Sequence, residues 1–472
     1  MKVAEAGNPA RRGWFDRQGL RLIAKPYLSG AFVTQRLLER LPVEKEALKD
    51  LTAGYAGGIF DGPQSRRVYL TDPEHSVPFV GSKDMLVADL GALPRLSKAE
   101  AESPSLRYME LKPGMTLISR SGFNAGRRSY ARPDMDGFWS SEHVMKVVPD
   151  QSKIQPGYLY AFLASRFGEV LVRGGIYGSA VKHIAPDHVG EIPVPRFGDA
   201  VENEIHELVQ GAAELRAEFQ AGLEAATWDL FHTAGIEDLL DLRWHEQGRD
   251  LGFAQSGVTA TSLRALNFQP RARAIVERLG ERECVSLGEV CEGGMLRTGK
   301  RFKRIEAAPA HGVRLVGQRQ SFWVRPEGRW ISAEQAPDDI LQEDETVLIA
   351  AHGTLGENEV YGRSVLVTGA WLDNAFSQDF VRVVSGDPDV QGAYLFAFFR
   401  SEAAFRVLRS MSVGGKQQEY HAKLLRELPI PVLTQSDRDR IAATVRAAYK
   451  KRDEADRMED LGLAKLEEAV TG

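Results

Sequence analysis

The sequence contains few of the features of secreted, membrane-spanning or disulfide-bonded proteins. Its only cysteines are Cys284 and Cys291, too few for a disulfide scaffold, and we interpret them as buried structural thiols because no metal-type ligands are spaced closely around them. No apolar run approaches the ~18 residues of a membrane span. The first residues, MKVAEAGNPARRG, lack the apolar segment of a signal peptide. We therefore expect a cytoplasmic protein without a membrane partner.

Motifs of common enzymes are also scarce. The sequence contains no Asn-Pro-Pro-aromatic methyltransferase motif, no GxSxG and no HExxH. The stretch GMLRTGKR, residues 294–301, fits the GxxxxGK pattern of a phosphate-binding loop, but Arg301 stands where that motif has its magnesium-binding Ser or Thr. We interpret it as a basic loop that meets a phosphate backbone. A nuclease or nucleotide-dependent enzyme that uses Lys300 is the alternative. His183 and His188 are interpreted as surface or turn residues.

Positive charge is concentrated in two short stretches, although the net charge of −5 by itself disfavours nucleic-acid binding. Residues 297–304, RTGKRFKR, include five basic residues and no acid, and residues 119–133, SRSGFNAGRRSYARP, include four and no acid. Residues 453–468 hold seven acids against two bases. The distribution indicates basic loops on an otherwise acidic protein.

A long internal repeat is the strongest signal in the sequence. The phrases GEIPVPRF and RELPIPVL place Pro193 and Pro195 at a distance of 236 residues before Pro429 and Pro431, in a chain of 472 residues. The same shift aligns residues 143–212 with 379–448 without a gap and with 16 identities. A period this long indicates a duplicated domain rather than a solenoid. Prolines restrict the backbone, so we expect each phrase to be a stiff extended strap between a domain and the helix that follows it.

The expected fold class is α/β (mixed α+β), with a pseudo-two-fold internal repeat. Each unit is predicted to open with a short helix, continue through strands with glycine-rich turns, and add amphipathic helices at 158–172 and 394–408. Possible caps at 199–202 and 436–439 then start two long helices with one apolar stripe each. The expected domains are residues 1–198, spacer helix 199–234, linker and second domain 235–434, and spacer helix 435–472.

Basic and amide side chains in the loops are the candidates for contact with DNA. Arginine can bind guanine through two hydrogen bonds, and Asn or Gln can bind adenine in the same way. Because the two units share a scaffold and differ in these loops, we expect two different half-sites in a split target. The candidates are Arg66, Arg67, Arg120, Asn124, Arg127, Arg128, Lys182, Arg297, Lys300, Arg301, Lys303, Arg304, Arg319, Lys416, Gln417 and Gln418. A helical adaptor without direct DNA contact is a further alternative.

The repeat, the two proline phrases, the small-residue loops GGIYGSAVKHI and SVGGKQQEY, and the following helices resemble the specificity (S) subunits of type I restriction-modification systems. The resemblance covers nearly the whole chain. It implies two target-recognition domains separated by two antiparallel spacer helices, and a non-catalytic subunit of a restriction or related phage-defence complex. Its partners would be double-stranded DNA, two DNA adenine methyltransferase subunits docked on the spacers and, in some systems, a motor-nuclease subunit. No cofactor is expected in this chain, since S-adenosylmethionine and ATP would bind the partners. The docking residues expected on the spacers are Ile205, Val209, Leu215, Ile441, Val445 and Met458.

Overall fold

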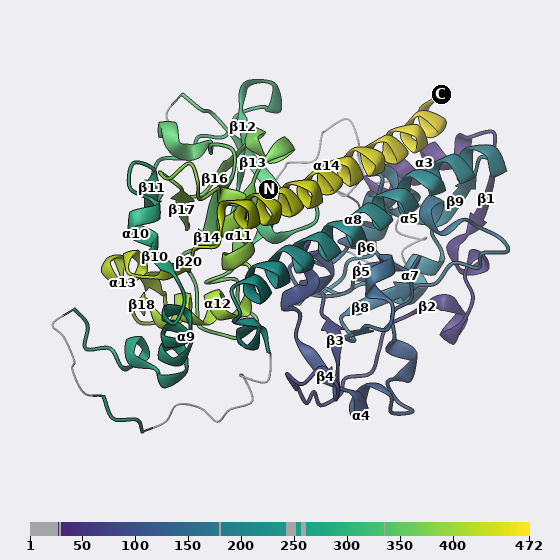
Figure 1. Ribbon diagram of the computed structural model, residues 1–472. Coiled ribbons are helices and arrows are strands. Elements are labelled where there is room, and N and C mark those ends of the chain that lie inside the picture. The colour runs from purple at the N-terminus through teal and green to yellow at the C-terminus, as the bar shows by residue number, and fades with distance from the viewer. Residues whose placement is uncertain (1–26, 28–29, 179–180, 242–251, 256–260, 335) are drawn as a thin grey trace.

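Two globular units flank a pair of long helices in this computed structural model (Figure 1). The structure describes residues 27, 30–178, 181–241, 252–255, 261–334 and 336–472. The first 26 residues of the predicted first domain and parts of the predicted linker lie outside these ranges. The expected mixed α+β fold with an internal repeat is confirmed.

Unit 1, residues 30–198, contains short helices and three small sheets. Its helices are α3 (Ala31–Arg40), α4 (Lys98–Ala101), α5 (Pro156–Ala164), α6 (Arg166–Gly174) and α7 (Pro186–Gly190). Its strands are β1 (Glu44–Ala47), β2 (Ile59–Phe60), β3 (Ser76–Val80), β4 (Arg95–Ser97), β5 (Thr116–Ser119), β6 (Arg128–Tyr130), β7 (Trp139–Ser140), β8 (Val144–Val147) and β9 (Pro193–Arg196). The sheets have the orders β2-β8-β5-β6, β4-β3-β7 and β1-β9.

Unit 2, residues 261–434, repeats this arrangement. Its helices are α9 (Pro270–Gly280), α10 (Leu287–Val290), α11 (Gly392–Phe399), α12 (Glu402–Ser410) and α13 (Ala422–Arg426). Its strands are β10 (Cys284–Ser286), β11 (Met295–Thr298), β12 (Val313–Val316), β13 (Gly328–Ile331), β14 (Thr346–Ala350), β15 (Ser364–Val367), β16 (Asn374–Phe376), β17 (Phe380–Val384), β18 (Ser412–Val413), β19 (Glu419–Tyr420) and β20 (Pro429–Pro431). The orders β11-β17-β14-β15, β13-β12-β16 and β10-β20 match those of unit 1 strand for strand, including a parallel pair at the same place in each unit.

The proline phrases form β9 and β20, each paired antiparallel with the first strand of its unit. Prolines are tolerated there because a two-stranded sheet leaves one side of each strand without backbone partners. The Tyr158 hydroxyl donates a hydrogen bond to the carbonyl of Pro195, and the matching Tyr394 donates to Pro431 at 2.8 Å. The extended conformation expected for the phrases is therefore held on both sides by its own unit.

The two long helices are α8 (Asp199–Thr233) and α14 (Gln435–Thr471). At ~1.5 Å per residue they are about 52 and 55 Å long. The N-caps of both helices lie one or two residues before the predicted positions. The N-cap of α8 is Gly198, and the carboxylate of Glu202 accepts from the amide of Phe197. In α14 the cap is Thr434, whose hydroxyl accepts from the amide of Asp437 at 3.3 Å.

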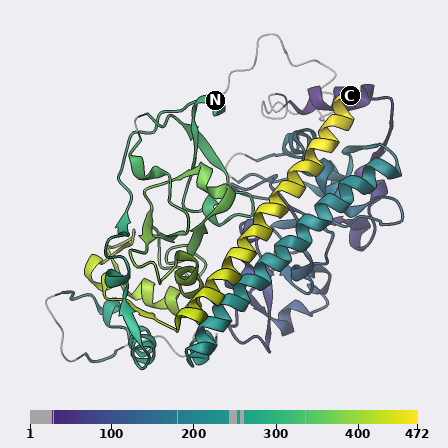
Figure 2. The same cartoon turned by 45° about the horizontal axis from the view of Figure 1, so that its top comes forward.

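The long helices run antiparallel side by side, as Figure 2 shows. Ion pairs that join Glu204 to Lys465 and Asp229 to Arg440 connect the start of each helix to the end of the other. Both helices enter both cores: Leu223 of α8 packs in the core of unit 2, and Leu466 of α14 packs in the core of unit 1. The helix pair therefore belongs to both units.

The two cysteines are free thiols, Cys291 buried and Cys284 half-buried. Burial raises the pKa of Cys284 to about 11 and that of Cys291 to about 12, so neither is an activated nucleophile. Among the described helices, none has the length and apolar content that a bilayer crossing requires.

Candidate nucleic-acid interface

In unit 1, four loops meet at one end of the sheet β2-β8-β5-β6, and we name them loop cluster 1 (61–67, 120–128, 141–143 and 177–183, of which residues 179 and 180 are not described). They meet because β2 and β5 end where the antiparallel strand β8 begins. Arg120 pairs with Asp61 at 2.8 Å, and the hydroxyl of Ser121 lies 2.8 Å from Nδ1 of His143. The amide of Gly122 donates to the carbonyl of Lys182 at 3.0 Å.

The same strand geometry in unit 2 produces loop cluster 2 (299–304, 351–359, 377–379 and 413–419). Arg304 donates to the side chain of Gln378 at 2.7 Å, and Nε2 of His352 lies 3.2 Å from Glu419. The amide of Gln418 donates to the carbonyl of Gly353 at 2.8 Å. Each unit thus gathers loops that are far apart in the sequence onto one surface, which includes most of the predicted DNA-contacting residues.

Six of the predicted arginines already have side-chain partners within their own unit. They are Arg67 with Glu142, Arg120 with Asp61, Arg128 with Glu169, Arg297 with Asp339, Arg304 with Gln378, and Arg319 with Glu359. Asn124 and Gln418 hydrogen-bond to the backbone of nearby loops, at Ser82 and Gly415. Arg127 and Arg319 lie where the two units face each other, since Arg127 pairs with Glu327 and Arg319 lines the cavity between the units.

Ten predicted residues are exposed, and seven of them have neither an ion pair nor a side-chain hydrogen bond among the described residues. These seven are Arg66 and Lys182 in loop cluster 1 and Lys300, Arg301, Lys303, Lys416 and Gln417 in loop cluster 2. Six of the seven are cations. These side chains are the ones free to neutralise an anionic partner such as a phosphate backbone.

A buried cation lies under each loop cluster at matching positions of the repeat. Lys146 in β8 and Arg382 in β17 are 0% and 1% exposed. Lys146 donates to the hydroxyl of Ser140 at 3.0 Å, and burial lowers its pKa to about 7. Burial also lowers the pKa of Arg382, whose guanidinium lies so close to Gly299 that a Cβ there would overlap it. These cations support the loops from below and do not reach the surface.

Acidic, imidazole and apolar side chains in the clusters were missed by the sequence analysis. They are Asp61, Glu142, His143 and Phe123 in loop cluster 1 and His352, Asp379 and Glu419 in loop cluster 2. The phenyl ring of Phe123 is 84% exposed at a loop tip. Their place in the sequence could have identified these residues, because all of them lie in segments that adjoin strands or loops matched by the repeat.

The structure contradicts a phosphate-binding loop at residues 294–301. Residues Met295–Thr298 form β11, which pairs with β17 in the middle of the motif. The loop therefore cannot wrap a phosphate ahead of a helix, and Lys300 lies in the exposed loop that follows the strand. Within the described residues, no cluster of three or more His, Cys, Asp or Glu side chains could hold a metal ion.

Most of the expected docking residues on the long helices face inward. Ile205, Val209, Ile441 and Val445 are at most 2% exposed. Leu215 and Met458 are half-buried, and the methyl of Met458 packs over Gly211 of the opposite helix. Four of the six therefore stabilise this chain's own fold, and a partner could reach only the outer side of the helix pair.

No family model and no curated protein matches this sequence. Solved structures do resemble it. The chain is similar to S subunits of type I restriction-modification systems. An S subunit from M. genitalium shares 13% identity over 90% of this chain and 96% of its own, with a TM-score of 0.32. The HsdS subunit of Thermoanaerobacter tengcongensis shares 14% over 93% and 96%, with a TM-score of 0.24.

A third similar chain comes from a structure titled for the complex assembly and conformational transition of the type I R-M system. It shares 15% identity over 92% of this chain and 98% of its own, with a TM-score of 0.27. The likeness therefore spans nearly the full length of both chains at low identity, and the function of this chain is inferred from its own residues and their arrangement.

Proposed function

We propose that this chain is the DNA-recognition subunit of a type I restriction-modification complex or a related phage-defence complex. Loop clusters 1 and 2 would each contact one half of a split, asymmetric target in double-stranded DNA. The observation that carries the proposal is the pairing of one scaffold, repeated strand for strand, with two loop clusters of different side chains. Methylation and cleavage would reside in partner subunits.

The six exposed cations that have no partner among the described residues provide the affinity in this proposal. Four of the six, Lys300, Arg301, Lys303 and Lys416, lie in loop cluster 2. Contacts between such side chains and phosphates release counterions, so binding should weaken steeply as salt rises. Phe123 adds an exposed ring of the kind that contacts thymine methyl groups or enters a base step.

Differences at matching positions provide the asymmetry of the target. At the constant shift of 236, loop cluster 1 has Glu142, His143, Lys182 and His183 where loop cluster 2 has Gln378, Asp379, Gln418 and Glu419. These pairs differ in charge or in hydrogen-bonding groups, so the two units present different donors and acceptors to base edges. Equal half-sites would require equal side chains.

The helix pair is long enough for a target with two half-sites, and its outer side is available to a partner protein. Its length of about 52 to 55 Å exceeds the ~34 Å between half-sites one helical turn apart. We propose that two DNA adenine methyltransferase subunits dock on the outer side of α8 and α14. S-adenosylmethionine and ATP would then bind the partners, and a motor-nuclease subunit could join the complex.

Selection from random duplex DNA, with the full chain and its methyltransferase partners, tests the proposal. We expect enrichment of one sequence with two specified blocks and an unspecified gap. Reversal of Lys300, Arg301 and Lys303 to Glu should weaken binding to all sequences, whereas a helical adaptor would retain its function. A pool that remains random after selection by the wild-type complex would overturn the proposal.

The distribution of methylated adenines in the genome provides an independent test in cells. Deletion of the gene should remove methylation at one split motif and leave other motifs unchanged. Replacement of the loops of cluster 1 alone should change only one block of the motif. If deletion leaves every methylated motif in place, this chain does not direct a methyltransferase.

A further inference from the structure

The two units contact each other directly, away from the long helices, through the same segment of the repeat. The amide of Ala88 donates to the carbonyl of Phe322 at 2.9 Å, and the amide of Val324 donates to Leu86 at 2.7 Å. Val87 and Trp323 form the antiparallel bridge between them, and these two residues are 236 positions apart. The contact is therefore a pseudo-two-fold one, in which each unit presents the same surface to the other.

An ion pair beside this bridge joins Asp89 of unit 1 to Arg400 of unit 2 through two hydrogen bonds of 2.6 and 2.8 Å. The Arg400 side chain is 11% exposed. Burial by itself would raise the pKa of Asp89, but the Arg400 guanidinium outweighs it and holds that pKa below its usual range. Gln220 of α8 donates to the same carboxylate at 3.2 Å, so the long helices are tied to this contact.

A second ion pair lies on the other side of the bridge. The guanidinium of Arg127 binds Glu327 through two nitrogens and lies over the ring of Trp323, 4.5 Å from its centre. The ammonium of Lys83 also donates to the carbonyl of Asn358 at 2.7 Å. Arg127 belongs to loop cluster 1 and Asn358 to loop cluster 2, so each cluster contributes a residue to the contact with the opposite unit. We name Leu86–Asp89, Arg127, Phe322–Val324, Glu327 and Arg400 the unit interface.

The charged residues of the unit interface differ between matching positions of the two units. Arg325 occupies the position of Asp89, Ala164 that of Arg400, and Gly91 that of Glu327. Two copies of unit 1 meeting in this way would place Asp89 opposite Ala164 and leave a partly buried carboxylate unpaired. Such a charge is costly to bury without a partner. The charges of the interface therefore disfavour a pairing of two copies of unit 1.

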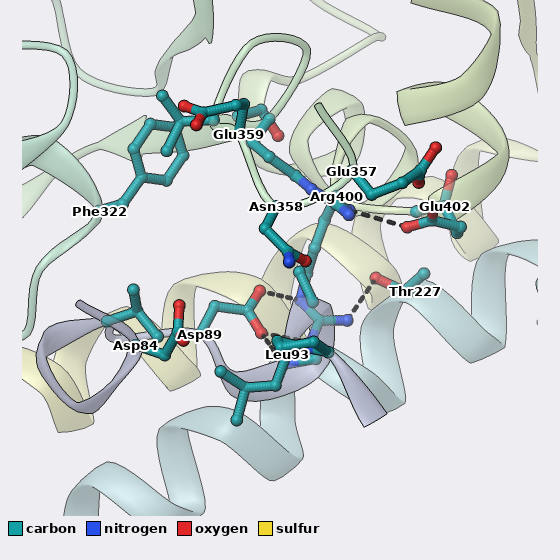
Figure 3. A pocket seen from close by; sticks show the side chains of 18 of the residues that line it. Asp84, Asp89, Leu93, Thr227, Phe322, Glu357, Asn358, Glu359, Arg400 and Glu402 are labelled. Carbon is teal, nitrogen blue, oxygen red and sulfur yellow. Dashed lines mark hydrogen bonds and ion pairs between the residues drawn. The ribbon is translucent and has the colours of Figure 1, made fainter. Parts of the chain in front are cut away.

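A cavity of about 450 Å³ lies along one side of the unit interface. Figure 3 shows Arg400 at its floor, between Asp89 and Thr227, with Phe322 and Asn358 above. The two units thus meet at the bridge and the ion pairs, with an open space beside these contacts. Because of this space, side chains at the interface can be changed without overpacking the interior.

We propose that the unit interface sets the gap between the two half-sites of the DNA target. The inference rests on the function proposed above. Addition of one base pair moves the half-sites apart by ~3.4 Å and rotates one relative to the other by roughly 35°. Units held together by the interface cannot carry their loop clusters through that change. The long helices already pack into both cores, and the unit interface adds a second fixed contact between the units, away from the helices.

The test compares a reversed variant, Arg127→Glu with Arg400→Glu, and a swapped variant that adds Glu327→Arg and Asp89→Arg. Lys451→Glu, which breaks an ion pair with Glu218 between the long helices, is the matched control. Glu327→Gln removes one ion pair without burying a charge and serves if the reversed variant does not fold. The distance between the units is measured by electron spin resonance with labels on Gln64→Cys and Ala308→Cys, after replacement of both native cysteines by alanine.

Binding is measured with duplexes that keep both half-sites and change the gap by one base pair. The wild type and the control should give one narrow distance distribution and discriminate against the wrong gap by about 5- to 150-fold, as for a misplaced base pair. The reversed variant should give a broad distribution and lose most of that discrimination, and the swapped variant should regain both.

Two results would overturn the inference while the proposed function stands: a narrow distribution in the reversed variant, or a broad one with the gap preference intact. A wild-type chain that selects no split target would overturn the proposed function, and the spacing role with it.

Discussion

Two cationic side chains lie buried beneath the loop clusters. Lys146 and Arg382 occupy matching positions in β8 and β17, and both are fully buried cations. Within the described part of the chain, neither has a carboxylate at hydrogen-bonding distance, unlike Arg216 on α8, which binds Asp456 and Glu459. A buried cation without a close counter-charge lowers stability, so these two positions are where the free energy of unfolding should depend on ionisation.

Lys146→Met should stabilise the protein at neutral and lower pH. Below about pH 7 the buried ammonium is charged in the folded protein. Above that pH the folded protein releases the proton, whereas the unfolded chain retains it up to about pH 10. The free energy of unfolding of the wild type should therefore rise by up to about 1.4 kcal/mol per pH unit across this window, and the advantage of the variant should shrink.

Urea denaturation at several pH values between about 6 and 9.5 measures this difference. Lys416→Met, at an exposed loop position, is the control and should show no such trend. A stability gap between Lys146→Met and the wild type that stays constant with pH would contradict the ionisation of Lys146 in this range.

At the scale of elements, the long helices are joined by a buried polar cluster near the middle of the pair. Arg216 of α8 binds Asp456 and Glu459 of α14, and the hydroxyl of Tyr160 donates to Glu459 at 2.7 Å. The side chains of Arg216 and Glu459 are 9% and 5% exposed. Burial would raise the pKa of Glu459, but Arg216 and Arg325 hold it below its usual range.

Arg216→Met should destabilise the protein by about 3 to 5 kcal/mol, because it leaves the Glu459 carboxylate buried without its main partner. The double variant Arg216→Met, Glu459→Met should recover at least half of that loss. Lys451→Met removes an exposed pair of the same two helices and should cost at most about 1 kcal/mol. Urea denaturation measures all three, and equal losses for the single and double variants would rule out the unpaired charge as the cause.

At the scale of the whole molecule, exposed cations on two separate loop clusters should act together on one DNA duplex. The triple variant Lys300→Ala, Arg301→Ala, Lys303→Ala should lower the slope of log affinity against log salt by about 2 to 3, at roughly 0.9 for each phosphate that the variant no longer neutralises. Arg40→Ala, Lys450→Ala, Arg457→Ala removes the same charge from exposed helix positions and should leave the slope unchanged. Fluorescence anisotropy over a range of salt concentrations measures both, and equal slopes would mean that these loop residues do not bind phosphates.

Most of the architecture could be predicted from the sequence because it is encoded locally and then repeated. Proline phrases, helical periodicity and strand patterns each depend on neighbouring residues, and the repeat places most elements twice. The helix caps were misplaced by one or two residues because several polar side chains near Gly198 and Thr434 could fill that role. Element ends are decided by competing local hydrogen bonds.

The sequence by itself determined the duplication, the mixed α+β units, the two long helices and the basic character of the loops. Only the tertiary structure decided which of those basic side chains remain free. Arg127 and Glu327 are 200 residues apart, and Asp89 and Arg400 are 311 apart. No local pattern relates such pairs, because they meet only after each unit has folded and the antiparallel helices have brought the two units together.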